Sequence, residues 1–182
     1  MKNPFPLLDD ITIKHCKNVA KIAMHLAGGT GLDTSLVLDA AIWHDAGKAK
    51  MLNIVSKTGR LSDEDFETIK QHPVYGCEII KQKYEGAYPE DVARVALCHH
   101  KRKDGSGYPE NVDVDQIDML VQIIQIADVY EALTAKRTYK DAFTHDKAKN
   151  MIINGECGYF SNEVIRIFKA LIDDYYRLCN VM

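Results

Sequence analysis

Apolar residues recur at spacings of three and four along most of the chain. The clearest repeat lies between residues 7 and 27, at Leu8, Ile11, Val19, Ile22 and Leu26. This spacing places the apolar side chains on one side of an α-helix. We find no segment with the strict apolar and polar alternation of a half-buried strand. The pattern therefore predicts an all-α fold.

Similar repeats, separated by turn residues, extend to the end of the sequence. We expect helices at about 7–27, 33–45, 62–72, 73–83, 89–99, 115–136, 144–153 and 161–178. No change of composition and no linker divides the chain. Residues 1–182 are therefore expected to form a single domain, a bundle of about seven or eight helices.

Several helix ends carry recognisable capping residues. Asp33 stands at a plausible N-cap position, and Ser62 with Asp65 has the form of a capping-box variant. We expect His72 to end its helix, because Pro73 disfavours the helical conformation in the residue before it.

Composition limits the classes of function. The chain has 46% apolar and 27% charged residues, no apolar run long enough to span a bilayer, and no signal-like segment at its start. Its net charge of −3 gives no general attraction for duplex nucleic acid or an anionic membrane, so any anion site must be local. Five cysteines without a C-x-x-C motif favour reduced thiols and a cytoplasmic location.

Ligand-type residues lie on or beside the apolar faces of several separate helices. They are His15, His44, Asp45, His72, His99, His100 and Asp128. A lone histidine in such a place is ordinarily a hydrogen-bonded core residue. Burying this many imidazoles and carboxylates together would cost several kcal/mol for each unpaired charge, and shared metal ions remove that cost.

The chemistry of this set favours manganese, iron(II), cobalt or zinc over a structural zinc site built on cysteines. The adjacent pair His44 and Asp45 is suited to a carboxylate that bridges two metals while the imidazole binds one. Two such metals can activate water and hold both oxygens of an in-line phosphoryl displacement.

A phosphate substrate also needs cations. Lys48 follows the His44–Asp45 pair, and Arg137 and Lys140 are expected at the end of the helix that carries Asp128. Along a continuous helix, Arg137 would lie about 13 Å beyond Asp128. That separation matches a dinucleotide better than a bare phosphate.

Five motifs in this order resemble the HD-GYP group of the HD phosphohydrolases, over nearly the whole chain. They are "HCKNVAKIA", "AAIWHDAGK", "IVSKTGRLSDEDFETIKQHPVYG", "HHKRKDGSGYP" and "IIQIADVYEALTAKRTYK", and "GYFSNEVIRIF" is similar to the closing segment of the group. Each motif alone is weak, but five in register make a chance match improbable.

The resemblance implies a mostly helical HD-type fold and a cyclic di-GMP phosphodiesterase that yields pGpG or GMP. It also implies bound metals, commonly iron or manganese, a hydroxide that bridges two of them, and a 3′ oxygen that leaves. The seven residues above would be the ligands, with Asp45 bridging and Lys48 contacting the scissile phosphate or the hydroxide. Tyr108, Arg137 and Lys140 would hold phosphates, while Gly105 and Gly107 would shape the nucleotide pocket.

The sequence departs from the pattern of the group at three positions. Ile11 replaces the glutamate that ligates a third metal, so we expect two metals. Lys101 replaces a glutamate after the histidine pair, and it either points to solvent or marks a site whose chemistry has drifted. Glu131 stands where the group usually has aspartate and keeps the charge.

We also expect no separate sensor or receiver domain, so regulation would come from expression, metal supply or a separate protein partner.

Other functions stay open at this point. Some members of the group prefer cyclic GMP-AMP, and a degenerate domain would bind metal or nucleotide without turnover and act as an interaction module. A mononucleotide hydrolase is a further alternative, against which the intact "DGSGYP" and "RTYK" segments count. The sequence leaves the native metal and the oligomeric state undetermined.

Overall fold

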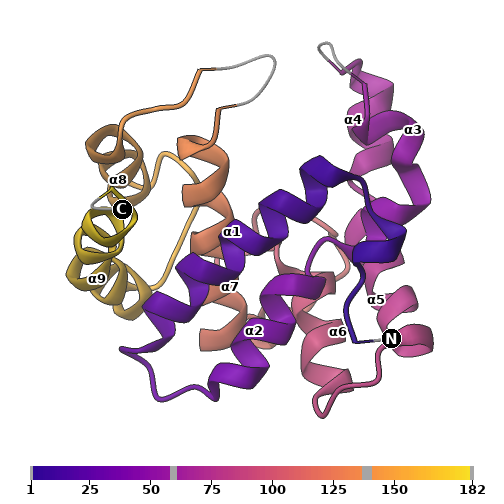
Figure 1. Ribbon diagram of the computed structural model, residues 1–182, viewed down its shortest axis with the longest axis horizontal. Coiled ribbons are helices and arrows are strands. Elements are labelled where there is room, and N and C mark those ends of the chain that lie inside the picture. The colour runs from indigo at the N-terminus through magenta and orange to yellow at the C-terminus, as the bar shows by residue number, and fades with distance from the viewer. Residues whose placement is uncertain (1, 58–60, 137–140, 181–182) are drawn as a thin grey trace.

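The computed structural model describes residues 2–57, 61–136 and 141–180, and this part of the chain is helical (Figure 1). The α-helices are α1 (Asp10–Ala27), α2 (Thr34–Trp43), α3 (Leu52–Val55), α4 (Asp63–Ile69), α5 (His72–Lys83), α6 (Pro89–Cys98), α7 (Met119–Thr134), α8 (His145–Ile153) and α9 (Asn162–Asn180). Three 3-10 helices are η1 (Phe5–Leu7), η2 (Ala46–Met51) and η3 (Val114–Gln116). The described residues contain no strand, so the all-α prediction is confirmed, and the single-turn α3 is the helix that was not expected.

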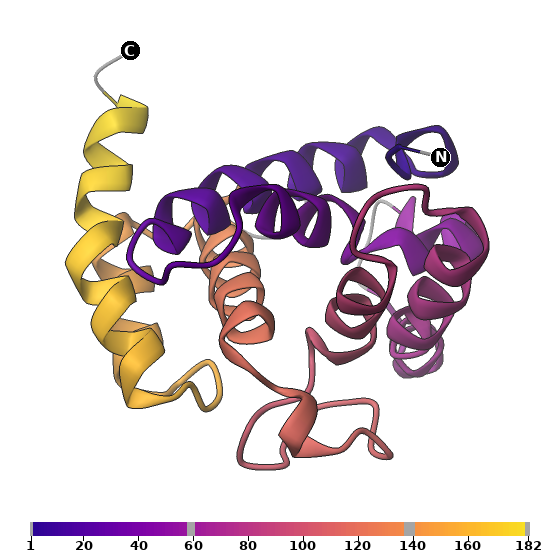
Figure 2. The ribbon, with the colours of Figure 1, turned by 90° about the horizontal axis from the view of Figure 1, so that it is seen from below.

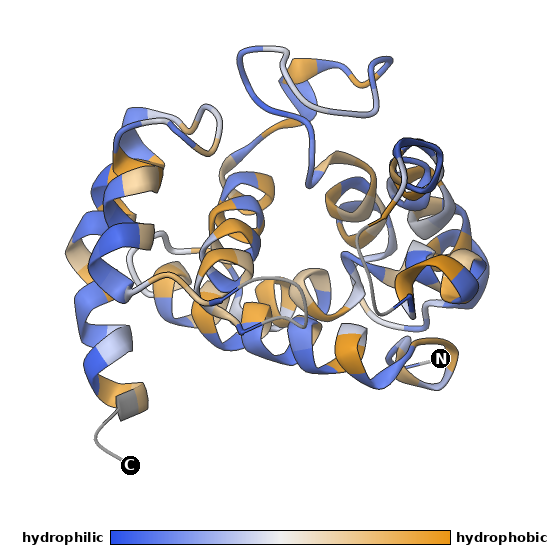
Figure 3. Cartoon of the chain, turned by 90° about the horizontal axis from the view of Figure 1, so that it is seen from above, coloured by the Kyte–Doolittle hydropathy of each residue, from blue (hydrophilic) through white to orange (hydrophobic). Residues whose placement is uncertain are grey.

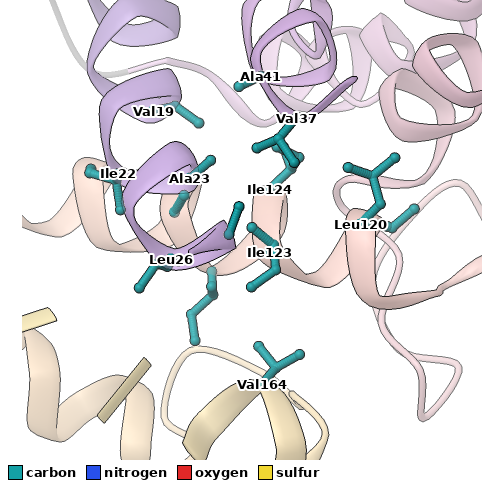
Figure 4. Close-up of a cluster of buried hydrophobic side chains, with 14 of the residues drawn as sticks. Val19, Ile22, Ala23, Leu26, Val37, Ala41, Leu120, Ile123, Ile124 and Val164 are labelled. Carbon is teal, nitrogen blue, oxygen red and sulfur yellow. The ribbon is translucent and has the colours of Figure 1, made fainter. Parts of the chain in front are cut away.

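The main core forms where α1, α2 and α9 pack on α7. Ile123 and Ile124 of α7 lie among side chains of these helices, including Val37 and Val164 (Figure 4). All four side chains are fully buried, which stabilises the fold by about 1.5–3 kcal/mol for each. The long apolar run of α7 is explained by contacts with helices on several sides.

A second core joins α2, α5 and α6. It consists of Trp43, Ala46, Ile79, Ile80, Val92, Ala93 and Ala96. Figure 2 shows α1 and α2 spanning two groups of helices, α7–α9 on one side and α5 with α6 on the other. In this arrangement the candidate functional residues come together. They lie at the ends of α2 and α6, at the start of α5, and within α1 and α7.

The predicted caps at the starts of α2 and α4 are confirmed. The Asp33 carboxylate accepts from the amides of Ser35 and Leu36, and Ser62 forms a full capping box with Asp65. These interactions are local, which is why the sequence reveals them.

Other predicted boundaries are wrong. His72 begins α5 instead of ending a helix, because Pro73 lies in the first turn, where its missing N–H leaves no hydrogen bond unmade. The helix expected from residue 7 begins at Asp10, where Asp9 caps it.

The helix expected at 115–136 is shorter at both ends. It begins at Met119, because the Asp118 side chain accepts from the Val121 amide, and it ends at Thr134. The separation expected between Asp128 and Arg137 assumed one continuous helix, so that estimate no longer holds. Arg137 and Lys140 themselves lie outside the described residues.

Polar and apolar faces separate on the outer helices, most clearly on α9 (Figure 3). Its apolar side chains Val164, Phe168 and Ile172 are fully buried against the main core. None of the helices in the described ranges combines the length and apolar content needed to cross a bilayer.

Candidate metal centre

The structure brings all seven predicted ligands together from five places in the chain. His15 lies on α1, His44 and Asp45 lie between α2 and η2, and His72 begins α5. The other three are His99 and His100, which follow α6, and Asp128 on α7. Among these seven residues, two sets of three have ligand atoms within 4.8 Å of one another, namely His15, His44 and Asp128, and His72, His99 and His100. We call them the aspartate group and the three-histidine group.

Asp45 lies between the two groups and is 1% exposed. Its Oδ2 atom lies 3.5 Å from the Nε2 atoms of both His15 and His44. Its Oδ1 atom lies 3.3 Å from Nε2 of His72 and 3.7 Å from Nε2 of His99. One carboxylate thus presents one oxygen to each group, which is the arrangement expected of a bridging ligand.

Helix ends orient three of the histidines in the same way. Nδ1 of His44 donates to the Ala41 carbonyl at 2.7 Å, three residues earlier in the chain. His72 donates to Ile69 at 2.7 Å in the same manner. His99 follows this pattern with the Ala96 carbonyl at 2.8 Å. Because a carbonyl only accepts, each Nδ1 carries a proton, and Nε2 is the ring nitrogen that faces the site.

These Nε2 atoms fit divalent metal ions. Nε2 of His72 and Nε2 of His99 are 2.9 Å apart, although neither has a proton to donate when the rings are neutral. Nε2 of His44 and Oδ1 of Asp45 are buried without a hydrogen-bond partner. A shared cation satisfies such groups, and imidazole with carboxylate is a donor set that first-row metals accept.

Protonation states agree with this interpretation. Burial lowers the pKa of His44 and His99, and it lowers the pKa of His100 to about 3, so these rings are neutral. Burial alone would raise the pKa of Asp128, but the hydrogen bond and charge of His15 hold it well below its ordinary value.

His15 differs from the other histidines. Burial by itself lowers its pKa, but hydrogen bonds to Asp128 and Glu131 raise it to about 9. Its Nε2 lies 3.0 Å from Oδ1 of Asp128, and its Nδ1 lies 2.6 Å from Oε2 of Glu131. Glu131 is 5% exposed, and its Oε1 accepts from Asn18 at 3.1 Å.

Asn18 was not predicted as a site residue, and Glu131 was noted only because it keeps the charge of the aspartate usual in the group. The spacing of three residues between Asp128 and Glu131 places both carboxylates on the same side of α7, and this could have identified Glu131. Glu131 also lines a surface pocket of about 420 Å³ between α1, α7, α8 and α9, to which none of the seven predicted ligands contributes.

Lys48 contacts Asp45, whereas its predicted contact with the phosphate or the hydroxide stays a prediction. Its Nζ lies 2.5 Å from Oδ2 of Asp45. Burial alone would lower the pKa of Lys48, but the charge of Asp45 raises it, so the ammonium stays protonated. Ile11 is 70% exposed and has no atom that could bind a metal.

The loop after the histidine pair needs glycine. Gly107 has a φ of 81°, and a Cβ atom there would lie 2.0 Å from the His100 carbonyl oxygen. Gly105, with a φ of 87°, makes the turn itself. The loop folds back so that the Tyr108 ring stacks on the His100 ring, with the two ring centroids 4.6 Å apart. Burial raises the pKa of Tyr108, so its hydroxyl keeps its proton.

Lys101 does not point to solvent, so that alternative is wrong. The residue is 5% exposed, and its Nζ donates to the Glu110 carbonyl at 3.3 Å. Its backbone pairs with Gly107 as an isolated bridge. The Lys101 ammonium is thus bound within the loop, which the sequence could not show because the contact spans nine residues without a regular pattern.

Two further residues that the sequence analysis missed fix the end of α6. The Gln125 side-chain amide, on α7, donates to the Cys98 carbonyl at 3.0 Å and to the Lys101 carbonyl. The Arg102 guanidinium donates to the His99 carbonyl at 3.1 Å. These side chains bond to carbonyls just before, within and just after the histidine pair, so they hold its backbone in place.

Comparisons with known proteins agree with this geometry. The sequence model of the HD domain matches residues 7–162. A cyclic di-GMP phosphodiesterase of Vibrio cholerae is 34% identical over 77% of this chain and 30% of its own length. A cyclic di-GMP phosphodiesterase of Thermotoga maritima is 32% identical over 91% of this chain and 47% of its own. The chain therefore spans about a third to a half of the length of these relatives.

Solved structures share the fold. The HD domain of the phosphodiesterase PgpH of L. monocytogenes, in complex with cyclic-di-AMP, superposes with a TM-score of 0.64 at 20% identity, covering 93% of this chain and 90% of that one. The HDG"Y"P protein Bd1817 of Bdellovibrio bacteriovorus gives a TM-score of 0.68 at 20% identity, covering 91% and 52%. With the family match over residues 7–162, these findings show that the chain belongs to the HD-domain family, in its HD-GYP group.

Proposed function

We propose that this protein is a metal-dependent phosphodiesterase of cyclic dinucleotides, with cyclic di-GMP as the substrate and pGpG or GMP as the product. The observation that carries the proposal is Asp45, whose Oδ2 atom faces the aspartate group and whose Oδ1 atom faces the three-histidine group. The names of the relatives support the substrate class.

The metal centre would hold two divalent ions, iron or manganese, with Asp45 shared between them. The aspartate group would bind one ion and the three-histidine group the other. When bound, such ions lower the pKa of water and neutralise charge on the phosphate. The exposed Ile11 offers no ligand for a third ion.

Residues beside the centre would bind and orient the substrate. Lys48 would contact the scissile phosphate, and its ion pair with Asp45 beside the two groups supports this role. Tyr108 keeps its proton and can donate to a second phosphate oxygen. Gly105 and Gly107, whose positive φ angles form the turn, would bring the loop backbone close to the nucleotide. Arg137 and Lys140 stay predicted phosphate ligands from the sequence.

Cyclic GMP-AMP is the alternative substrate. A 3'3'-cGAMP-specific phosphodiesterase of Vibrio cholerae is 28% identical over 88% of this chain. A degenerate binding module is the third candidate, and Lys101 does not decide it, because its ammonium donates to the Glu110 carbonyl instead of pointing to solvent.

The test is an assay of anaerobically purified protein loaded with manganese or iron(II). We expect linear product from cyclic di-GMP, or from cyclic GMP-AMP if that is preferred, and none from the His44→Ala variant. Binding of a cyclic dinucleotide without turnover would support the module instead. Absence of linear product from both substrates, with no difference between wild type and variant, would overturn the proposal that this protein is an enzyme.

A further inference from the structure

The two metal-binding groups differ in the charge that surrounds them. The aspartate group contains Asp128, and the carboxylate of Glu131 lies directly behind His15. The rings of His72 and His99 in the three-histidine group are backed by neutral main-chain carbonyls. Asp45 serves both groups and does not distinguish them.

Lys48 offsets part of this difference. Its Nζ contacts Oδ2 of Asp45, the oxygen that faces the aspartate group. Once a metal ion has displaced the Nε2 proton of His15, this one positive charge is set against the two carboxylates of Asp128 and Glu131. The aspartate group therefore keeps the greater negative charge of the two.

The contact between Glu131 and His15 also fixes the ring. With Oε2 of Glu131 at 2.6 Å, the Nδ1 proton is held on the side away from the site, and Nε2 is directed at Asp128 and Asp45. Asn18 holds the other oxygen of Glu131. An anionic partner makes a metal-binding imidazole more basic, and loss of such a partner typically costs 10- to 100-fold in metal affinity.

We propose that Glu131, held by Asn18, is a positioning residue for His15 that makes the aspartate group the tighter of two metal sites and the first to fill. The three-histidine group fills second, so it sets the metal concentration at which the centre becomes complete. The inference rests on the proposed metal centre, but it concerns an order of binding that the proposed function does not require.

The experiment is calorimetric titration of metal-free protein with Mn²⁺, without any nucleotide. Wild type should show a tight step followed by a weaker one. Glu131→Gln keeps the size of the side chain and an oxygen that accepts from His15, but it removes the charge and the oxygen that accepts from Asn18. We expect it to weaken the tight step by about 10- to 100-fold and to leave the weaker step unchanged.

Two further variants assign the steps. His100→Asn should abolish the weaker step and preserve the tight one, because His100 belongs to the three-histidine group. Asn18→Ala should also weaken the tight step, because Asn18 holds Glu131 in place. If circular dichroism shows that Glu131→Gln is unfolded, Asn18→Ala is the variant that tests the inference.

Equal weakening of both steps in Glu131→Gln, no change in either step, or two equivalent sites in wild type would overturn this inference and leave the metal centre intact. Loss of the tight step in His100→Asn would reverse the order and also overturn it. Absence of Mn²⁺ binding by wild type would instead remove the proposed metal centre, and this inference with it.

Discussion

At the scale of the residue, Asp45 decides whether one centre or two separate sites exist. It is the residue whose oxygens approach both histidine groups, and its position directly after His44 made it recognisable in the sequence. Its burial would be unfavourable without nearby cations, since an isolated buried carboxylate costs several kcal/mol.

Asp45→Asn should therefore disable the whole centre. The amide cannot bridge two cations, so we expect loss of both metals in elemental analysis and a fall in turnover of more than about 100-fold, beyond the effect typical of residues that only support a ligand. Retention of either metal at wild-type affinity would show that Asp45 does not bridge.

We expect a substitution at Lys101, unlike one at Asp45, to leave the metal centre intact. Its ammonium contacts the Glu110 carbonyl, so Lys101→Met should cost about 1 kcal/mol of unfolding free energy for the lost hydrogen bond. Metal content and turnover should stay as in wild type. Urea unfolding, elemental analysis and the phosphodiesterase assay measure these quantities, and loss of metal in the variant would place Lys101 at the centre.

At the scale of the element, the position of His72 relative to Asp45 depends on how closely η2 approaches α5. A Cβ atom at Gly47 would lie 1.8 Å from the His72 carbonyl oxygen and 2.6 Å from the Gly76 amide nitrogen. Only glycine therefore allows this approach, which accounts for the glycine two residues after Asp45.

Gly47→Ala should destabilise the protein by about 3 kcal/mol, because the backbones of η2 and α5 must separate. Gly76→Ala is the matched control, since its Cβ would meet Gly47 N at 3.3 Å and Ala96 Cβ at 3.4 Å. Because alanine favours the helix, we expect the control to stay within about 1 kcal/mol of wild type. Denaturant unfolding of both variants tests this, and equal destabilisation would argue against the close approach.

The helices and their caps could be predicted from the sequence because the contacts that define them are local. Asp33 and Ser62 bond to amides within three residues, and the ligands could be recognised because each stands at an apolar face or a helix end. The missed residues act over longer separations. Gln125 reaches carbonyls more than twenty residues away, and Glu131 contacts a ring on α1.

At the scale of the whole molecule, the predicted ligands meet because α1 and α2 span two groups of helices that carry different members of the set (Figure 2). His15 and Asp128 come from the main core, while His72 and His99 come from the side of the second core. Metal binding is therefore expected to stabilise the fold as well as to supply chemistry.

The stability of the metal-free protein should depend on pH through His15. Its pKa is raised from 6.5 to about 9 in the folded chain, so protonated His15 stabilises the fold fully below pH 6.5, and this contribution is lost as pH rises through 9. We expect a decrease on the order of 3 kcal/mol over that interval. Denaturant unfolding at several pH values measures it, and the decrease should be absent from His15→Gln and from metal-loaded protein. An identical decrease in His15→Gln would assign it to other groups.

The position of the bound metals tests the account most directly. Anomalous scattering from crystals of the manganese-loaded protein should show two peaks, one between Oδ2 of Asp45 and the aspartate group, the other between Oδ1 and the three-histidine group. No peak should lie beside Ile11. A single peak, a third peak on the Ile11 side, or metals that do not contact Asp45 would contradict the proposed centre.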